Sequence, residues 1–289
     1  MKLIGLAARN LFRVQIPLLK FGKSRDEMEA DEINKELREI LVRMITSREE
    51  AEIDREAPGS FGDDFLASLV RAKNSGDPNK RISLEEMVDE CKTFYFAGQE
   101  TLNSSLTWTV YLLALHPHWQ DEVRKEVGRV FGQNAPDPEG LAKLKTMGMV
   151  INEALRLYPP TAGITRRVQK KAVRLGNVTL PADMNLFIPT LWCHYNPDVW
   201  GQDAHRFKPE RFAEGIAKAT GNNMTAFMPF GLGQRNCVGS SFATAEVKTT
   251  LSMILQRFSF SLSPAYVHSP CLQVTLRPQH GVQLILHPL

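Results

Sequence analysis

The sequence predicts a mainly helical fold with a small β-sheet (α+β class), and three observations predict it. Apolar residues recur at helical spacing through the first half of the chain. Short alternating runs divided by Gly, Asn, Pro and Asp turn signals follow from residue 167. The last thirty or so residues alternate like a hairpin. A chain of 289 residues with 43% hydrophobic and 23% charged residues is ordinary for a folded domain, and we expect one domain over 1–289.

The first helix is expected over residues 26–50, where apolar residues form one stripe that faces a core. Its stripe consists of Ile33, Leu37, Ile40, Leu41 and Met44. A segment rich in Pro, Gly and Asp, 57–63, breaks this helix. A short helix over 65–72 and a solvated loop over 73–81 follow.

The next three helices carry their own start and stop signals. Ser83 and Glu86 form a capping box that opens a long helix, which ends at about Leu115 because His116-Pro117 stops it. An amphipathic helix over 119–131 ends at Gly132. Another helix over 147–157 is closed by Tyr158-Pro159-Pro160.

The second half predicts strands and one further long helix. Proline-rich irregular structure is expected up to about Gly233, and a helix from near Cys237 to Gln256. The expected strands are 167–175, 178–180 and 186–188, followed by the hairpin strands 258–262 and 282–286.

Composition excludes several classes of protein. A formal net charge of +3 and a pI of about 8.6 are well short of the basic excess of a nucleic-acid binder, so no nucleic-acid partner is expected. Four widely spaced cysteines argue against a zinc site and a disulfide scaffold. The apolar start is broken at Arg9 and Arg13, too early for a secretory signal, and no transmembrane segment is found.

The stretch 230–239, Phe-Gly-Leu-Gly-Gln-Arg-Asn-Cys-Val-Gly, is the strongest chemical signal. A lone cysteine is more often a small buried hydrophobe. Here two glycines permit a tight turn against a flat ligand, and Cys237 is expected at a helix N-terminus that stabilises a thiolate. Arg235 offers a cation for an acidic group, and Gly239 removes a side chain that would strike the ligand. A glycine-rich loop before a structural helix explains the glycines but not the whole set.

Two further patterns lie on predicted helices. In Ala97-Gly-Gln-Glu-Thr101, a hydroxyl one turn after a mid-helix glycine could bond iron-bound oxygen, while Glu100 relays protons. A structural glycine with a capping threonine is the better explanation if this segment stands alone. Glu153 and Arg156 form an i, i+3 pair, usually a surface ion pair, but the segment 209–212 (Pro-Glu-Arg-Phe) is available to complete a buried network.

Taken in order along the chain, these motifs closely resemble the cytochrome P450 family over essentially the whole sequence. The amino-acid sequences of segments 89–101 and 275–281 resemble those of the plant clan that oxidises hormones, terpenoids and fatty acids. The resemblance implies the cytochrome P450 fold, N-terminally truncated, because family members carry a membrane anchor and several helices before this point. Met1 is therefore expected to begin a fragment, an alternative product or a truncated gene model.

The resemblance also implies roles for individual residues. Cys237 is the axial thiolate ligand of the iron of haem (heme b, iron protoporphyrin IX), and Glu100 and Thr101 are the acid–alcohol pair of oxygen activation. The implied structural triad is Glu153, Arg156 and Arg211. The other implied haem-binding residues are Phe230, Gly231, Gly239, Arg235 and Arg167, with Arg166 the less favoured choice. The implied substrate-pocket residues are Phe94, Tyr95, Ala97, Ile164 and Leu276.

The implied activity is a monooxygenase that inserts one oxygen atom from O2 into an apolar small molecule. Its electrons come from NADPH through NADPH–cytochrome P450 reductase. The full-length protein is expected on the cytosolic face of the endoplasmic reticulum membrane. Two alternatives stay open: an inactive truncated product that binds haem poorly, and a reductase-independent peroxide isomerase, against which the intact Glu100–Thr101 pair speaks.

Overall fold

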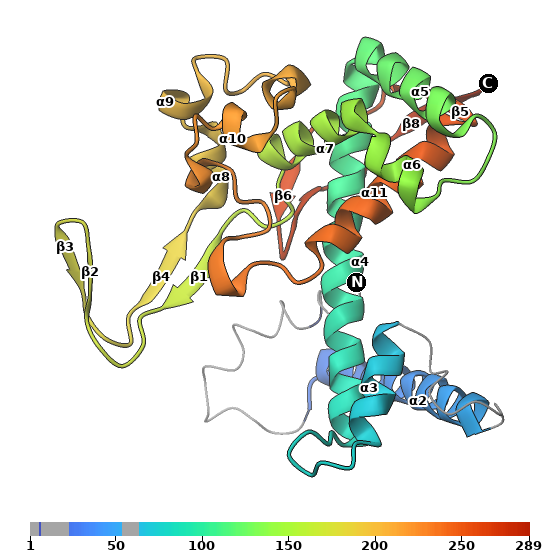
Figure 1. The fold of residues 1–289 in the computed structure, drawn as a ribbon, viewed down its shortest axis with the longest axis vertical. Helices are drawn as coiled ribbons and strands as arrows, with labels where there is room; N and C mark the ends of the chain where they lie inside the picture. The colour runs from blue at the N-terminus through green and yellow to red at the C-terminus, as the bar shows by residue number, and fades with distance from the viewer. Residues whose placement is uncertain (1–5, 7–22, 54–63) are drawn as a thin grey trace. The chain divides into compact units, whose positions relative to one another are not determined.

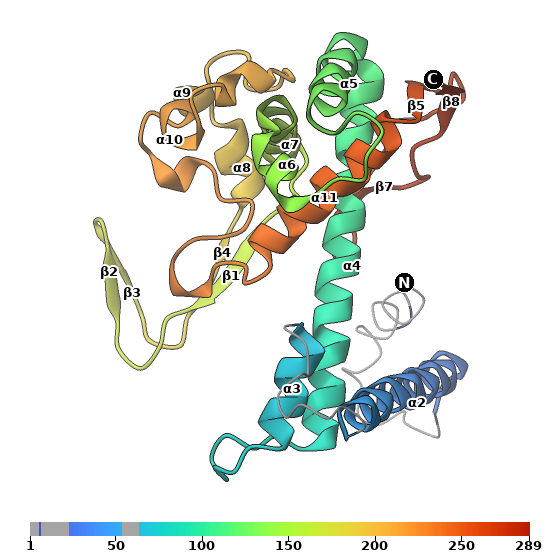
Figure 2. The ribbon, with the colours of Figure 1, turned by 45° about the vertical axis from the view of Figure 1, so that its right-hand side comes forward.

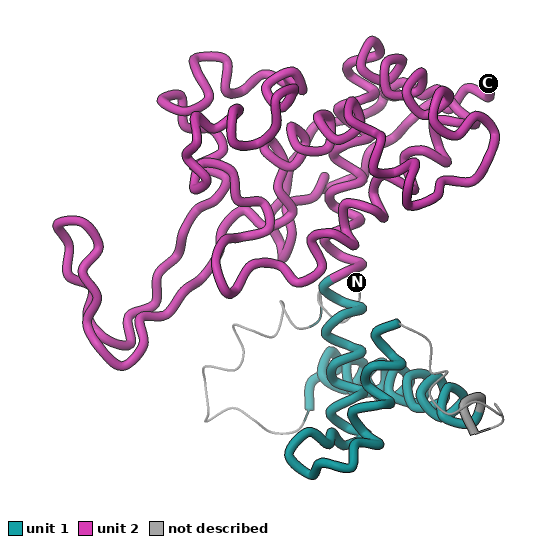
Figure 3. The backbone as a smooth tube through the Cα atoms, viewed as in Figure 1, with its two compact units in different colours: residues 1–97 teal, residues 98–289 magenta. Residues whose placement is uncertain are grey.

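The computed structural model describes residues 6, 23–53 and 64–289 (Figure 1). The chain divides into two compact units, Met1–Ala97 and Gly98–Leu289 (Figure 3). The single domain over 1–289 stays a prediction. The apolar start of the chain, apart from Leu6, and the predicted break at 57–63 lie outside the described residues.

The first unit packs helices α2 (Arg25–Ile53) and α3 (Phe65–Lys73) with the first half of α4 (Leu84–Leu115). The predicted capping box is confirmed, because Glu86 N donates to Ser83 Oγ at 3.2 Å and Ser83 N donates to Glu86 Oε2 at 2.7 Å. The buried apolar core of this unit consists of Leu41, Ile45, Leu69, Val70, Met87, Val88 and Cys91. The predicted stripe on the first helix thus supplies Leu41 to a core, whereas Ile40 and Met44 are exposed.

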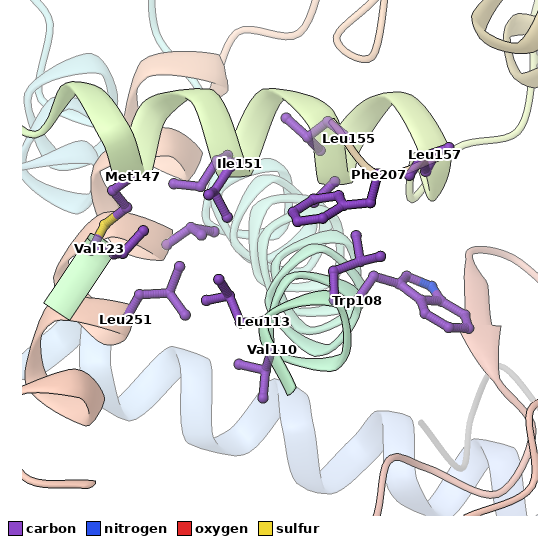
Figure 4. Close-up of a cluster of buried hydrophobic side chains, with 14 of the residues drawn as sticks. Trp108, Val110, Leu113, Val123, Met147, Ile151, Leu155, Leu157, Phe207 and Leu251 are labelled. Atoms are coloured by element: carbon purple, nitrogen blue, oxygen red, sulfur yellow. The ribbon is translucent and has the colours of Figure 1, made fainter. Parts of the chain in front are cut away.

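The second unit is built around the C-terminal half of α4, and Figure 2 shows α11 (Ser240–Leu255) crossing it. The helices α5 (Pro117–Phe131), α6 (Pro138–Lys143) and α7 (Lys145–Leu157) complete this helical layer. The fully buried side chains Trp108, Leu113, Val123, Met147 and Leu251 belong to one core cluster (Figure 4). The Glu126 carboxylate on α5 accepts from Thr146 N and Met147 N at 2.8 and 2.9 Å, so it satisfies the free N–H groups at the start of α7.

Four two-stranded antiparallel sheets accompany the helices of the second unit. The pairs are β1 (Ile164–Arg167) with β4 (Asn185–Ile188), β2 (Val173–Leu175) with β3 (Val178–Leu180), β5 (Phe258–Leu262) with β8 (Leu284–Pro288), and β6 (Pro270–Leu272) with β7 (Leu276–Pro278). The β2–β3 hairpin extends away from the helices of this unit (Figures 1 and 2).

A buried glutamine covers the outer edge of β5. Gln120 Oε1 accepts from Phe260 N at 3.0 Å, and Gln120 Nε2 donates to Phe260 O at 2.8 Å. In an antiparallel strand the N–H and C=O of one residue point the same way, so this side-chain amide takes the place of a neighbouring strand. The side chain of Gln120 is itself only 3% exposed.

The predicted helical class and small sheets are confirmed, with differences at several boundaries. The predicted strand 167–175 is wrong as one element: Ile164–Arg167 and Val173–Leu175 are separate strands in different sheets, and Lys170 between them has a φ of 31°. The pairing of the last predicted strands is confirmed, although β6 and β7 lie between them in sequence. Proline opens α5 at Pro117, two residues before the predicted start, because proline fits the first turn of a helix.

The region predicted as irregular contains short helices that the sequence pattern misses. These are α8 (Thr190–Tyr195), α9 (Pro197–Trp200), η2 (Pro209–Phe212), α10 (Ile216–Ala219), η3 (Met224–Ala226) and η4 (Gly233–Arg235). Each is too short to display a helical apolar repeat, and proline stands at the first turn of α9 and η2. Among the described residues, no helix combines the length and apolarity needed to cross a membrane.

Candidate functional site

The cysteine loop is a tight structure that leaves Cys237 exposed. Gly231 and Gly233 have φ values of 73° and 79°, in the left-handed region that glycine adopts without strain. Cys237 N donates to Phe230 O at 2.8 Å, which closes the loop across its base. The Phe230 side chain packs against the core of the second unit, so the loop is anchored at one end and open at the sulfur.

The helix after the loop begins later than the sequence predicts. The prediction put its start near Cys237, but α11 begins at Ser240 with Gly239 as its N-cap residue. The N–H of Cys237 is taken by Phe230 O, so Cys237 is held by the loop itself. A Cβ built on Gly239 would lie 4.0 Å from Cys237 Sγ, an ordinary contact distance.

The candidate arginines divide into two environments. Arg235 lies in η4 and is exposed. Arg166 is half-buried, and its Nη2 lies 3.8 Å from the position of a Cβ on Gly231. Arg167 alternates to the other face of β1, where its Nη2 forms an ion pair with Asp183 Oδ1 at 3.0 Å. The structure therefore places Arg166, the choice less favoured from the sequence, beside the cysteine loop, and places Arg167 on the other face of the strand.

The structure brings Glu153, Arg156 and Arg211 together. Glu153 and Arg156 are fully buried on α7 and form two hydrogen bonds, Nε to Oε2 at 2.7 Å and Nη2 to Oε1 at 2.8 Å. Arg211 Nε lies 3.5 Å from Glu153 Oε1. An i, i+3 pair of this kind usually lies on the surface, but here it is part of a buried network that includes Arg211 of the segment 209–212, as predicted.

Arg156 also binds backbone carbonyls far along the chain. Its Nη1 donates to His194 O at 2.8 Å and Ala204 O at 2.6 Å, and its Nη2 donates to Arg206 O at 3.2 Å. The planar guanidinium supplies five donors in a fixed fork, which suits this arrangement. One side chain therefore fixes three points of the segment that precedes the cysteine loop.

Sequence reasoning missed Asp203 in this network. Arg211 Nη2 donates to Asp203 Oδ1 at 2.6 Å, and Lys208 Nζ donates to Asp203 Oδ2 at 2.7 Å. Hydrogen bonds from Lys208 and Arg211 hold the pKa of the Asp203 carboxyl well below its usual value. The signal available in the sequence was an acid a few residues before a basic pair. This pattern is common on protein surfaces, so it did not distinguish Asp203 from an ordinary surface carboxylate.

The Glu100 carboxylate is buried and bonded at a distance in sequence. Thr275 Oγ1 donates to Glu100 Oε1 at 2.9 Å, and both side chains are less than 9% exposed. Thr101 follows on α4 and is half-buried. Besides Asp203, Thr275 is a second site residue that sequence reasoning missed, because 175 positions separate it from its partner Glu100.

A cytochrome P450 family profile matches residues 6–286. The chain belongs to the cytochrome P450 family. A cyanobacterial P450 of this family, CYP120A1 solved with retinoic acid bound, superposes with a TM-score of 0.81 at 27% identity, covering 99% of this chain and 62% of that one. The P450 fold predicted from the sequence is therefore confirmed.

Plant members of the family are similar over nearly the whole chain. Cytochrome P450 CYP749A22 of Panax ginseng is 50% identical over 285 residues, covering 98% of this chain and 54% of that protein. The 11-oxo-beta-amyrin 30-oxidase of Glycyrrhiza uralensis is 43% identical, covering 99% and 55%. The 7-deoxyloganic acid hydroxylase of Catharanthus roseus is 41% identical, covering 96% and 54%. The chain spans about half the length of these curated relatives.

The residues around Cys237 fit the haem that the P450 family implies. The cysteine is exposed, and glycine backbone on either side leaves room for a flat ring. Val238 and Phe242 beside it are 83% and 65% exposed and offer apolar surface to such a ring. Arg166 near the loop and Arg235 within it are cations of the kind that could hold the acidic groups of a haem.

The predicted substrate-pocket residues lie in different parts of the chain. Phe94, Tyr95 and Ala97 belong to the first unit and are exposed; the Phe94 ring packs against the Phe65 ring in a tilted arrangement, with ring centroids 4.2 Å apart. Ile164 is half-buried in β1 of the second unit. Leu276 is buried, and its carbonyl accepts from Ser104 Oγ and Trp108 Nε1 at 2.6 and 2.7 Å. Their role as a pocket stays a prediction.

An aromatic cluster surrounds Trp108 of α4, whose indole N–H binds the Leu276 carbonyl. The Trp108 ring stacks on Tyr158 at 4.2 Å, and the Tyr111 ring stacks on His268 at 5.1 Å. Tyr266 Oη lies 2.9 Å from His268 Nδ1. Burial raises the pKa of Tyr266 to about 12, so its hydroxyl keeps its proton at alkaline pH values where a solvent-exposed tyrosine ionises.

Proposed function

We propose that this chain carries the thiolate side of a haem monooxygenase. In this proposal one oxygen atom of O2 is inserted into an apolar small molecule of the terpenoid class. The observation that carries the proposal is the exposed Cys237, presented by a glycine loop in a member of the P450 family. Two relatives are named for oxidising an amyrin and a deoxyloganic acid, which supports the substrate class.

Each site residue then has a chemical task. Cys237 binds iron as the thiolate, and Phe230, Gly231 and Gly239 shape the surface on which the ring lies. When bound, the haem supplies the binding and reductive activation of O2. Arg235 and Arg166 bind the acidic groups of the ring, and Arg167 remains the alternative predicted from the sequence.

Glu100 and Thr101 supply the proton path. The hydrogen bond from the Thr275 hydroxyl holds the Glu100 carboxylate in place for proton transfer, and Thr101 offers a hydroxyl next to it on α4. Glu153, Arg156 and Arg211 fix the segment before the cysteine loop. Phe94, Tyr95, Ala97, Ile164 and Leu276 are proposed to contact the substrate.

We further propose NADPH–cytochrome P450 reductase as the electron donor and the cytosolic face of the endoplasmic reticulum membrane as the site of the whole protein. Membership of the P450 family supports a redox partner and a small-molecule substrate. The reductase-independent isomerase alternative is separated by a turnover assay with and without NADPH and reductase. Product formation without either would replace the proposed monooxygenase by the isomerase.

The decisive test is the carbon monoxide difference spectrum of the reduced, haem-loaded 289-residue chain. We expect a thiolate-type Soret band, abolished in Cys237→Ser and kept in the matched control Cys271→Ser, whose cysteine lies in β6. A thiolate band that survives Cys237→Ser refutes the ligand assignment. No band in the unaltered chain refutes catalysis by this chain and supports the inactive alternative.

A further inference from the structure

His194 connects the buried ion pair on α7 to the segment that leads into the cysteine loop. It lies in α8, and its side chain is fully buried. Its backbone oxygen accepts from Arg156 Nη1 at 2.8 Å. Its ring Nε2 accepts from Met228 N at 3.1 Å, and its ring lies 5.4 Å from that of Phe227. One residue therefore binds the ion pair through its backbone and the loop segment through its imidazole.

Two backbone hydrogen bonds hold the loop between Met228 and Cys237, and they meet at the neighbouring residues Phe230 and Gly231. Met228 O accepts from Gly231 N at 3.1 Å, and Phe230 O accepts from Cys237 N at 2.8 Å. Pro229 has no N–H, so the entry to the loop has few backbone donors with which to hold its position. The bond from Met228 N to His194 is thus the tie between this entry and α8.

Only one form of the imidazole can make this bond. Nε2 accepts a hydrogen bond when the ring is neutral and the proton lies on Nδ1. Burial lowers the pKa of His194 to about 4, so the ring is neutral at physiological pH. Nδ1 is buried and has no partner among the described residues. Burying an unpartnered Nδ1 costs free energy, and an apolar side chain of the same size would avoid that cost. What histidine offers here, and an apolar side chain does not, is therefore the hydrogen-bond acceptor Nε2.

We propose that His194 is a positioning residue for the thiolate loop, acting as the hydrogen-bond acceptor for Met228 N–H. The inference deepens the proposed function and rests on it, since the loop matters to the reaction only if Cys237 binds iron. Through Arg156, the Glu153 carboxylate and the cysteine loop then belong to one connected set of hydrogen bonds. Loss of the acceptor at His194 loosens the loop while leaving the ion pair in place.

The test compares two substitutions by hydrogen exchange of the whole chain. His194→Phe keeps an aromatic ring but removes the acceptor, whereas His194→Gln keeps an oxygen near the position of Nε2. We expect exchange at Met228, Gly231 and Cys237 to be roughly tenfold faster or more in His194→Phe, because a buried N–H is left unsatisfied. His194→Gln restores protection to within about threefold of the unaltered chain. Equal protection in all three proteins, or no rescue by glutamine, overturns the proposal.

Three further measurements keep the outcome clear. Amide exchange at Val123 in α5 is expected to stay unchanged, which separates a loosened loop from a protein that fails to fold. If His194→Phe does not fold, 15N chemical shifts of the unaltered chain decide, because a proton on Nε2 overturns the proposal and a proton on Nδ1 supports it. In Cys237→Ser the protection of Met228 is expected to persist, so failure of the ligand assignment and failure of this inference give different results.

Discussion

Replacing Arg156 by lysine tests how much of the second unit depends on one buried side chain. Lysine keeps the positive charge but has three donors on a flexible stem, and it cannot reproduce a fork that makes five hydrogen bonds. At least two of those bonds are lost. Hydrogen bonds to charged groups contribute about 1.5–3 kcal/mol each. We therefore expect a loss of about 3–6 kcal/mol in the free energy of unfolding.

Urea denaturation followed by tryptophan fluorescence measures this loss. The Trp200 ring lies 5.1 Å from Arg156 Cζ and reports on this site. With a slope of about 2 kcal/mol per molar urea, the midpoint falls by roughly 1.5–3 M. The matched control is Arg129→Lys on the exposed face of α5, for which a change within about 0.5 kcal/mol is expected. A shift for Arg156→Lys no larger than that of the control refutes the reasoning.

The double variant Glu153→Leu with Arg156→Met separates the ion pair from the carbonyl contacts. Removing both charges avoids leaving either one buried alone, so part of the loss is recovered. Three carbonyls, of His194, Ala204 and Arg206, still lose their donor, and full recovery is not expected. A double variant as stable as the unaltered chain would show that these contacts contribute nothing.

Three further outcomes are expected. The pKa of His194 is about 4 in the folded chain against an ordinary 6.5, so the unfolded chain binds more protons between these values and stability falls as pH falls through this window. The charged groups on α7 near this histidine are Glu153 and Arg156. Between pH 7 and 5, the free energy of unfolding of the unaltered chain should fall by about 2 kcal/mol more than that of His194→Gln, as measured by urea titration. Equal losses in the two proteins would contradict a neutral, buried His194. Ser83→Ala removes a capping box and should cost about 1 kcal/mol, seen as faster amide exchange in the first turn of α4 but not in α11. Trp108→Phe should cost up to about 3 kcal/mol in thermal unfolding, mainly through the cavity left in the core, while Ser104 still donates to the Leu276 carbonyl. Adding Ser104→Ala should cost more than the sum of the two single changes, and simple additivity would exclude that shared acceptor.

Local chemistry predicted the elements whose signals lie within one turn or one repeat. The Ser83–Glu86 capping box and the His116-Pro117 stop placed the long helix correctly, since both act through neighbouring backbone groups. The start of α11 was misplaced by three residues because the loop, and not the helix, takes the N–H of Cys237. Glycine and cysteine spacing alone does not distinguish these two uses.

Hydrogen-bond partners far apart in the sequence could not be predicted from local sequence patterns. The Glu153–Arg156 pair was visible at i, i+3, but nothing nearby signals that Arg156 binds carbonyls 38 to 50 positions away. The same holds for His194 with Met228 and for Glu100 with Thr275. The choice between Arg166 and Arg167 depended on strand register, where a shift of one residue exchanges the two faces.

The amide of Gln120 has a consequence for how this chain behaves in a crowded solution. A sheet of two strands has two open edges, and an open edge can recruit a strand from another molecule and begin aggregation. On β5 the donor and acceptor of Phe260 are already engaged by a side chain from α5, so no foreign strand can bind there without first displacing it. A single buried amide thus protects a chain that is otherwise rich in exposed apolar side chains from adding copies of itself at this edge.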